Sequence, residues 1–131
     1  MSDSDERQGC EFDVFAPQCP SRQAFDHIFS RWGILVLARL TGDTLRFGEL
    51  RRAIGGISEK MLSQTLKVLE DEGLVRRQEW DEKPPRVEYS LTKSGERISD
   101  SIGGVIRNLY HELAQNYREQ SGTGSSGIVP R

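Results

Sequence analysis

The sequence is poor in the residues that build disulfide frameworks, metal centres and most active sites. It contains two cysteines and two histidines among 131 residues. Cys10 and Cys19 lie near one end, which does not make a disulfide framework, and His27 and His111 show no metal-ligand spacing. The sequence also shows no nucleophile–base constellation and no phosphate-binding glycine loop. We therefore expect a protein that is not an enzyme and that holds no metal or cofactor.

Long hydrophobic runs are also missing. The longest apolar run covers residues 34–38, which is much shorter than the roughly 20 residues that a membrane-spanning helix needs. The first residues are acidic, whereas a signal peptide begins with basic residues followed by an apolar stretch. We expect no membrane partner and a cytoplasmic location.

The chain has no excess of positive charge, which at first argues against a nucleic-acid partner. Its formal net charge is −2. Residues 1–13 hold five acidic residues and one basic residue, a charge of −4, which leaves +2 for the rest of the chain. A weakly basic body whose basic residues are clustered can still present a DNA-binding face.

The length fits one domain with one modest core, and composition divides the chain into three segments. Residues 1–18 are polar and acidic and are interpreted as a flexible arm. Residues 19–118 alternate apolar patterns with turn signals and form the expected folded domain. Residues 119–131 are rich in glycine and serine, and their Ile-Val-Pro-Arg ending resembles a protease-cleavage scar left by cloning.

Helix signals dominate the central segment, and a hairpin pattern interrupts them once. Helices are expected from Pro20, over residues 32–40 and 47–54, and from Glu59 to Glu72 after the N-cap Ser58. Strands are expected over residues 74–80 and 86–91, and a long helix from Lys93 to about Arg118. Gly103 and Gly104 lie inside this last helix and mark either a break or a close approach of another helix.

This order of elements predicts a mainly helical α+β fold. Two helices joined by a glycine-containing turn and followed by a hairpin are typical of a winged helix-turn-helix. The wing is expected to have two or three strands, since a short extended piece at residues 44–46 precedes the third helix. The apolar stripe of the last helix has nothing left to cover in a small core, which predicts a partner subunit.

The helix over residues 59–72 has the two faces of a DNA-recognition helix. Leu62, Leu66 and Leu69 form its apolar face. Its opposite face carries only hydrogen-bonding side chains, and this pairing suits a helix that is anchored behind and reads the major groove in front. We expect DNA contacts from this face, from the preceding helix and from the wing, which together contribute Lys60, Ser63, Gln64, Lys67, Arg51, Arg52, Arg77, Lys83 and Arg86. The wing bases could instead pair with the acidic residues of the hairpin.

These residues together resemble the HxlR family of winged-helix regulators, relatives of the MarR group. The most specific matches are the start of the recognition helix at Ile57-Ser58 and the wing sequence over residues 84–89. The resemblance implies a homodimer built from the first and last helices, binding a pseudo-palindromic operator in double-stranded DNA. Gly103 and Gly104 depart from the family pattern because they fall in the dimer helix.

The resemblance also implies a candidate sensor, because some members of the family respond to oxidants or electrophiles at the cysteine that corresponds to Cys19. A thiol at a helix N-terminus, with Arg22 one turn on, favours the reactive thiolate. Cys10 could act as the resolving partner. Cys19 could equally be a packing residue at the dimer interface. A small apolar ligand bound between the dimer helices, against Phe25, Trp32 and Tyr110, is an alternative trigger.

Two rival functions differ from a switched DNA-binding protein. A winged helix can serve only as a protein–protein interaction module, in which case no salt-dependent DNA affinity is expected. A constitutive DNA-binding protein would bind operator DNA without any effector.

Overall fold

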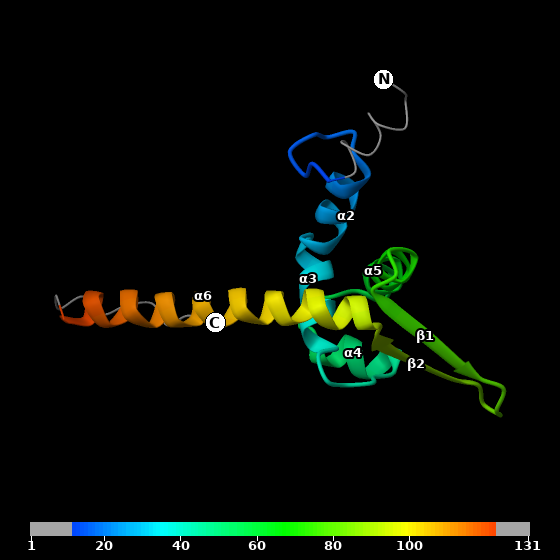
Figure 1. Cartoon of the computed structure of the whole chain (residues 1–131). Helices are drawn as coiled ribbons and strands as arrows, with labels where there is room; N and C mark the ends of the chain where they lie inside the picture. Colours follow the sequence, from blue (N-terminus) through cyan, green and yellow to red (C-terminus); the bar gives the residue numbers. More distant parts are fainter. Residues whose placement is uncertain (1–11, 123–131) are drawn as a thin grey trace, which may run out of the picture.

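The computed structural model describes residues 12–122, which fold into five helices and one two-stranded sheet (Figure 1). Three helices lead into the recognition helix: α2 (Pro20–Ile28), α3 (Arg31–Arg39) and α4 (Phe47–Ala53). They are followed by α5 (Glu59–Asp71), β1 (Val75–Trp80), β2 (Arg86–Leu91) and α6 (Lys93–Gly122). The order confirms the mainly helical winged helix-turn-helix that the sequence predicts.

The helices begin where the capping residues place them. Pro20 occupies the first turn of α2, with Cys19 as N-cap. Ser58 caps α5 by accepting a hydrogen bond from the Met61 amide at 3.0 Å, and Thr92 caps α6 by accepting one from the Gly95 amide at 3.0 Å. A side-chain oxygen at the N-cap satisfies an amide that the helix itself leaves unpaired, and so it fixes where the helix begins.

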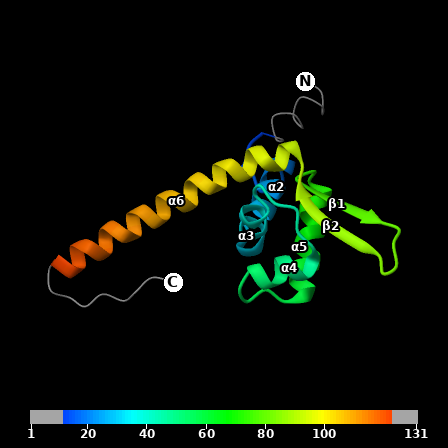
Figure 2. The ribbon, with the colours of Figure 1, turned by 90° about the horizontal axis from the view of Figure 1, so that it is seen from below.

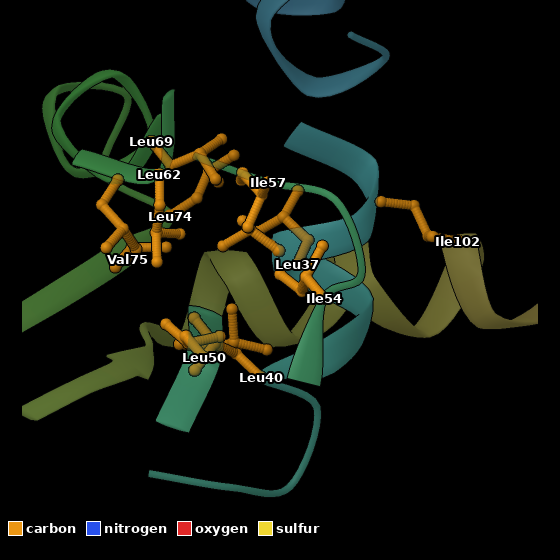
Figure 3. Packing of buried hydrophobic residues seen from close by; sticks show 13 residues of the cluster. Leu37, Leu40, Leu50, Ile54, Ile57, Leu62, Leu69, Leu74, Val75 and Ile102 are labelled. Atoms are coloured by element: carbon orange, nitrogen blue, oxygen red, sulfur yellow. The ribbon is translucent and has the colours of Figure 1, made fainter. Parts of the chain in front are cut away.

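One hydrophobic core joins all the elements from α3 onward (Figure 3). Leu37 of α3, Leu50 of α4 and Leu62 of α5 belong to this cluster, and all three are fully buried. The hairpin and α6 add Val75 and Ile102 to the same cluster. Burying such side chains contributes about 1.5–3 kcal/mol each, so this cluster holds the helix-turn-helix and the base of the wing together.

The wing is a two-stranded antiparallel hairpin with a short addition. β1 pairs with β2 in a register that runs from Val75 opposite Leu91 to Trp80 opposite Arg86. Leu45 adds an isolated bridge to Tyr89, with backbone hydrogen bonds of 2.9 and 2.7 Å. The extended piece before α4 therefore contributes a bridge to the wing rather than a full third strand.

The last helix, α6, is continuous for 30 residues and extends well beyond the core (Figure 1). Gly103 and Gly104 do not break it, and it ends at Gly122 rather than near Arg118. Its first turns are packed, since Gly95, Ser99 and Ile102 are buried. From Arg107 onward its side chains are mostly exposed, and Figure 2 shows this half of the helix standing free of the other elements.

The residues that follow α5 contact the residue that precedes α6, although the hairpin separates them in the chain. The Thr92 amide donates to the Leu74 carbonyl at 3.0 Å, and the Thr92 hydroxyl donates to the Gly73 carbonyl at 2.7 Å. Gly95 packs so closely here that a β-carbon would overlap the Leu74 carbonyl oxygen. The orientation of α6 relative to the recognition helix is therefore set at this junction.

Candidate nucleic-acid interface

The helix-turn-helix is formed by α4, a turn at residues 54–58, and α5. Gly56 adopts a φ of +84° in this turn, a conformation that glycine tolerates without steric cost. Ile54 and Ile57 on either side of it are buried and attach the turn to the core. The turn thus fixes the angle between the two helices from the core side. It leaves uncovered the face of α5 that points away from the core.

The structure separates the two faces of α5 as the sequence predicts. Leu62, Leu66 and Leu69 are buried in the core. The side chains on the other face are all exposed, and these are Lys60, Ser63, Gln64 and Lys67. Among the described residues, only Lys67 of this set has a bonded partner, Asp71, at 3.3 Å. An exposed pair of this kind is weak, so all four side chains are available to a ligand.

The preceding helix adds two arginines at the same side of the molecule. Arg51 and Arg52 are both exposed on α4. Arg51 lies 3.5 Å from the Glu59 carboxylate in the first turn of α5. No ion pair holds Arg52 within the part of the chain that the structure describes. Helix α4 can therefore offer cationic groups to a phosphate backbone beside the groove that α5 would enter.

On the wing, two of the three predicted basic residues are engaged within the hairpin. Arg77 donates to the Glu79 carboxylate at 2.9 Å, and this hydrogen bond, with a second one to Tyr89, raises the pKa of Arg77 above its usual value. The Arg86 guanidinium lies over the Trp80 ring at 4.1 Å and 3.5 Å from Glu82. The acidic residues of the hairpin therefore do pair with its bases, as the alternative reading of the sequence allows.

Of the three predicted wing bases, Lys83 is the one without an ion pair among the described residues. It lies in the turn between the strands, it is exposed, and within residues 12–122 no carboxylate pairs with it. Arg86 lies at the first position of β2, opposite Trp80, and not in the turn itself. The tip is therefore occupied by Lys83 and its neighbours.

We predict that Arg86→Ala destabilises the wing more than it weakens DNA binding. The substitution removes the stacking on Trp80 and the ion pair with Glu82, which together should lower the free energy of unfolding by about 1 kcal/mol. Thermal unfolding measures this loss. Lys83→Ala is the matched control: it should leave the unfolding temperature unchanged and reduce DNA affinity. The reverse pattern would show that Arg86 is the DNA contact.

The N-cap cysteine of α2 is enclosed by protein. Cys19 is fully buried and disulfide-bonded, and its side chain makes no capping hydrogen bond. Cys10, the other cysteine of the sequence, lies outside the described residues. Arg22, which was expected to favour a thiolate, has its guanidinium 3.3 Å from Asp26 and donates to the Val14 carbonyl. Its positive charge is thus shared with a carboxylate on the same helix.

Within one subunit, the three residues expected to bind an apolar ligand at the dimer interface lie apart. Phe25 packs on Phe29 with their ring centroids 4.7 Å apart, and both rings are exposed. Trp32 packs against the core, with the Arg31 guanidinium 4.9 Å from its ring centroid. Tyr110 lines a cavity between α3 and α6 that neither Phe25 nor Trp32 reaches. Within one subunit these side chains therefore do not line a common cavity, and a site formed by two subunits stays a prediction.

Sequence reasoning missed one contact between α2 and the recognition helix. The Nδ1 atom of His27 lies 2.7 Å from the Glu72 carboxylate, directly after the last turn of α5. The two residues are 45 positions apart, so no local pattern signals their contact. The pair joins the helix that begins at Cys19 to the end of the helix that carries Gln64.

Comparison with known proteins agrees with this geometry. The family model described as HxlR-like helix-turn-helix matches residues 27–121. The uncharacterised HTH-type transcriptional regulator YtfH of Escherichia coli is 50% identical over 95 residues, which are 72% of this chain and 75% of YtfH.

Solved structures show the same likeness. The structure of ytfH from Salmonella typhimurium aligns with a TM-score of 0.74 and 44% identity, covering 83% of this chain and 97% of ytfH. The redox regulator HypR in its oxidised form aligns with a TM-score of 0.62 and 31% identity, covering 68% of this chain and 92% of HypR.

Proposed function

The chain belongs to the HxlR-like helix-turn-helix family of transcriptional regulators, and on that basis we propose that it is a homodimer that binds operator DNA. The observation that carries the proposal is the exposed polar face of α5. Its side chains include a glutamine, which can pair with the two groove-facing nitrogens of adenine, and lysines, which reach guanine or phosphate. The buried leucines behind them hold the helix firmly enough to read bases.

Dimerisation is supported by apolar side chains that the folded subunit leaves uncovered. On α6, Val105 and Leu109 are 56% and 52% exposed, one turn apart on the same side of the helix. On α2, the contacting rings of Phe25 and Phe29 are exposed as well. Large apolar groups gathered in this way mark an interaction surface, and a two-fold dimer would cover them with the same surface of a second copy.

A symmetric dimer requires an operator with two half-sites at a defined spacing. Two copies of α5 in successive major grooves require half-sites whose centres lie roughly 34–36 Å, or about 10 base pairs, or a multiple of this, apart. Selection of genomic DNA fragments by the full chain tests this expectation, with the upstream region of its own gene included. Enriched inverted repeats at that spacing are expected. Enrichment of no sequence would favour the protein–protein interaction module.

The proposed regulator responds to oxidants through Cys19. The likeness to the redox regulator HypR and the disulfide-bonded state of Cys19 support this role. Oxidation of two thiols to a disulfide passes two electrons to the oxidant and releases two protons. Because Cys19 is the N-cap of α2, and α2 contacts the end of α5 through His27 and Glu72, such a change would act on the recognition helix.

We predict that treatment with the thiol oxidant diamide weakens operator binding of the wild-type chain and leaves Cys19→Ser unaffected. A coupling of the usual size would change the affinity by about 5- to 150-fold. Anisotropy titrations of the reduced and treated proteins measure it. Cys10→Ser tests whether Cys10 is the resolving thiol. An equal response of wild type and Cys19→Ser would contradict the sensor role, and the reduced variant must first bind DNA normally to show that it folds.

A further inference from the structure

A cavity of about 510 Å³ lies between α3, α6 and the end of α4, and the proposed DNA contacts do not use it. Figure 1 shows α6 crossing α3 beside α4 at this place. Residues one turn apart on α3 and α6 form the two walls, and Ala53, Ile54 and Gly55 close the end. Volumes of about 300–1,000 Å³ are typical of small-molecule sites.

The walls combine apolar surface with cationic and hydroxyl groups. Leu35 and Ile106 supply apolar surface, and Arg39, Arg107 and Tyr110 supply hydrogen-bond donors. None of the described residues that line the cavity is acidic. Neither guanidinium has an ion pair within residues 12–122. We propose that this cavity binds a small carboxylate with an apolar body, held by Arg39 and Arg107.

Gly103 explains how the Arg107 guanidinium comes to lie on the cavity wall. Long side chains of a helix point back toward its N-terminus, over the residue four positions before them. A β-carbon at Gly103 would lie 3.2 Å from Nη1 of Arg107, and one at Gly104 would lie 3.9 Å from Nη2. The glycines therefore leave room for the guanidinium to lie along α6. This accounts for two residues that each weaken a helix relative to alanine.

The position of the cavity connects the bound carboxylate to DNA binding. One side is the end of α4 and the turn of the helix-turn-helix, and the other is the helix whose apolar side chains we assign to the dimer. A ligand that contacts both would change the angle between α6 and the helix-turn-helix, and with it the distance between the two recognition helices. This consequence rests on the proposed function, whereas the binding of the carboxylate does not.

The test is direct titration of the full chain, without DNA, by calorimetry and nitrogen-edited NMR. The probes are benzoate, 4-phenylbutyrate and octanoate, each paired with the alcohol of the same carbon skeleton. At least one acid is expected to bind with a dissociation constant of about 1 mM or below, roughly tenfold or more tightly than its alcohol. Arg107→Gln should remove that difference. Gly103→Val, whose β-carbon would lie 3.2 Å from Nη1 of Arg107 and displace the guanidinium, should abolish binding.

Gly104→Ala is the control, because its β-carbon meets only the end of Arg107 at 3.9 Å. It should bind the acid as wild type does. No binding by any acid at about 10 mM, or equal binding to wild type, Arg107→Gln and Gly103→Val, would overturn the proposal. Gly103→Val could instead raise the dimer dissociation constant while wild type binds no acid. That result would show that the partner subunit, and not a carboxylate, occupies the cavity. Operator titration with and without the bound acid then tests the regulatory consequence separately.

Discussion

Gln64→Ala is expected to lower operator affinity by about 5- to 150-fold, because a good bidentate contact with a base contributes about 1–3 kcal/mol of discrimination. The side chain is exposed on α5, and none of the described residues is hydrogen-bonded to it. The substitution should therefore leave the unfolding temperature unchanged, and non-specific DNA affinity should change little. Anisotropy titration against operator and scrambled DNA of the same length measures both affinities.

Gln115→Ala provides the matched control for this substitution. Gln115 is exposed on the distal half of α6, where it accepts a hydrogen bond from Arg118 at 3.4 Å. Its loss should change neither operator affinity nor specificity. If Gln64→Ala binds operator as tightly as wild type, or if it weakens operator and scrambled DNA equally, then Gln64 does not read a base and the assigned face of α5 is wrong.

Gly95→Ala is expected to destabilise the fold by about 3 kcal/mol, at the upper end of what overpacking costs. The new methyl group would overlap the Leu74 carbonyl oxygen and would lie 3.0 Å from the Leu74 carbonyl carbon. This backbone cannot easily move away, since the same carbonyl accepts the Thr92 amide at 3.0 Å. Urea denaturation followed by circular dichroism measures the free energy of unfolding.

The effect of Gly95→Ala depends on its location rather than on the loss of a helical glycine. Gly104→Ala lies in the same helix with space around it, and there alanine should be neutral or stabilise by up to about 1 kcal/mol. A Gly95→Ala variant as stable as wild type would mean that α6 leaves the core at an angle other than the one described. The opposite signs of the two substitutions therefore test how α6 is attached.

Much of the fold could be predicted because its signals are local. Ser58 and Thr92 are N-caps, Gly73 follows α5, and the alternation of residues 86–91 indicates a strand, so the element boundaries fall within a few residues of those expected. The separation of α5 into a buried and an exposed face also follows from helical periodicity alone. These features need no knowledge of which elements pack together.

The features that the sequence could not predict depend on contacts between distant segments. The stacking of Arg86 on Trp80 depends on the hairpin register, and the ion pair of His27 with Glu72 depends on how α2 meets α5. Phe25, Trp32 and Tyr110 also lie apart within one subunit, because chemical type alone does not place side chains from three helices. The structure also places the Arg107 side chain beside Gly103, a contact that helix-breaking propensity alone does not indicate.

The measurement that tests the central claim most directly is an anisotropy titration of the reduced chain against DNA from the upstream region of its own gene. It is run at about 50 and 200 mM salt with excess competitor, since phosphate contacts release counterions. We expect competitor-resistant binding that weakens by about a thousandfold between these salts if six phosphates are contacted. Binding that is no tighter than to unrelated DNA, or that does not respond to salt, would contradict the claim that α5 and its neighbouring basic residues form a DNA-binding face.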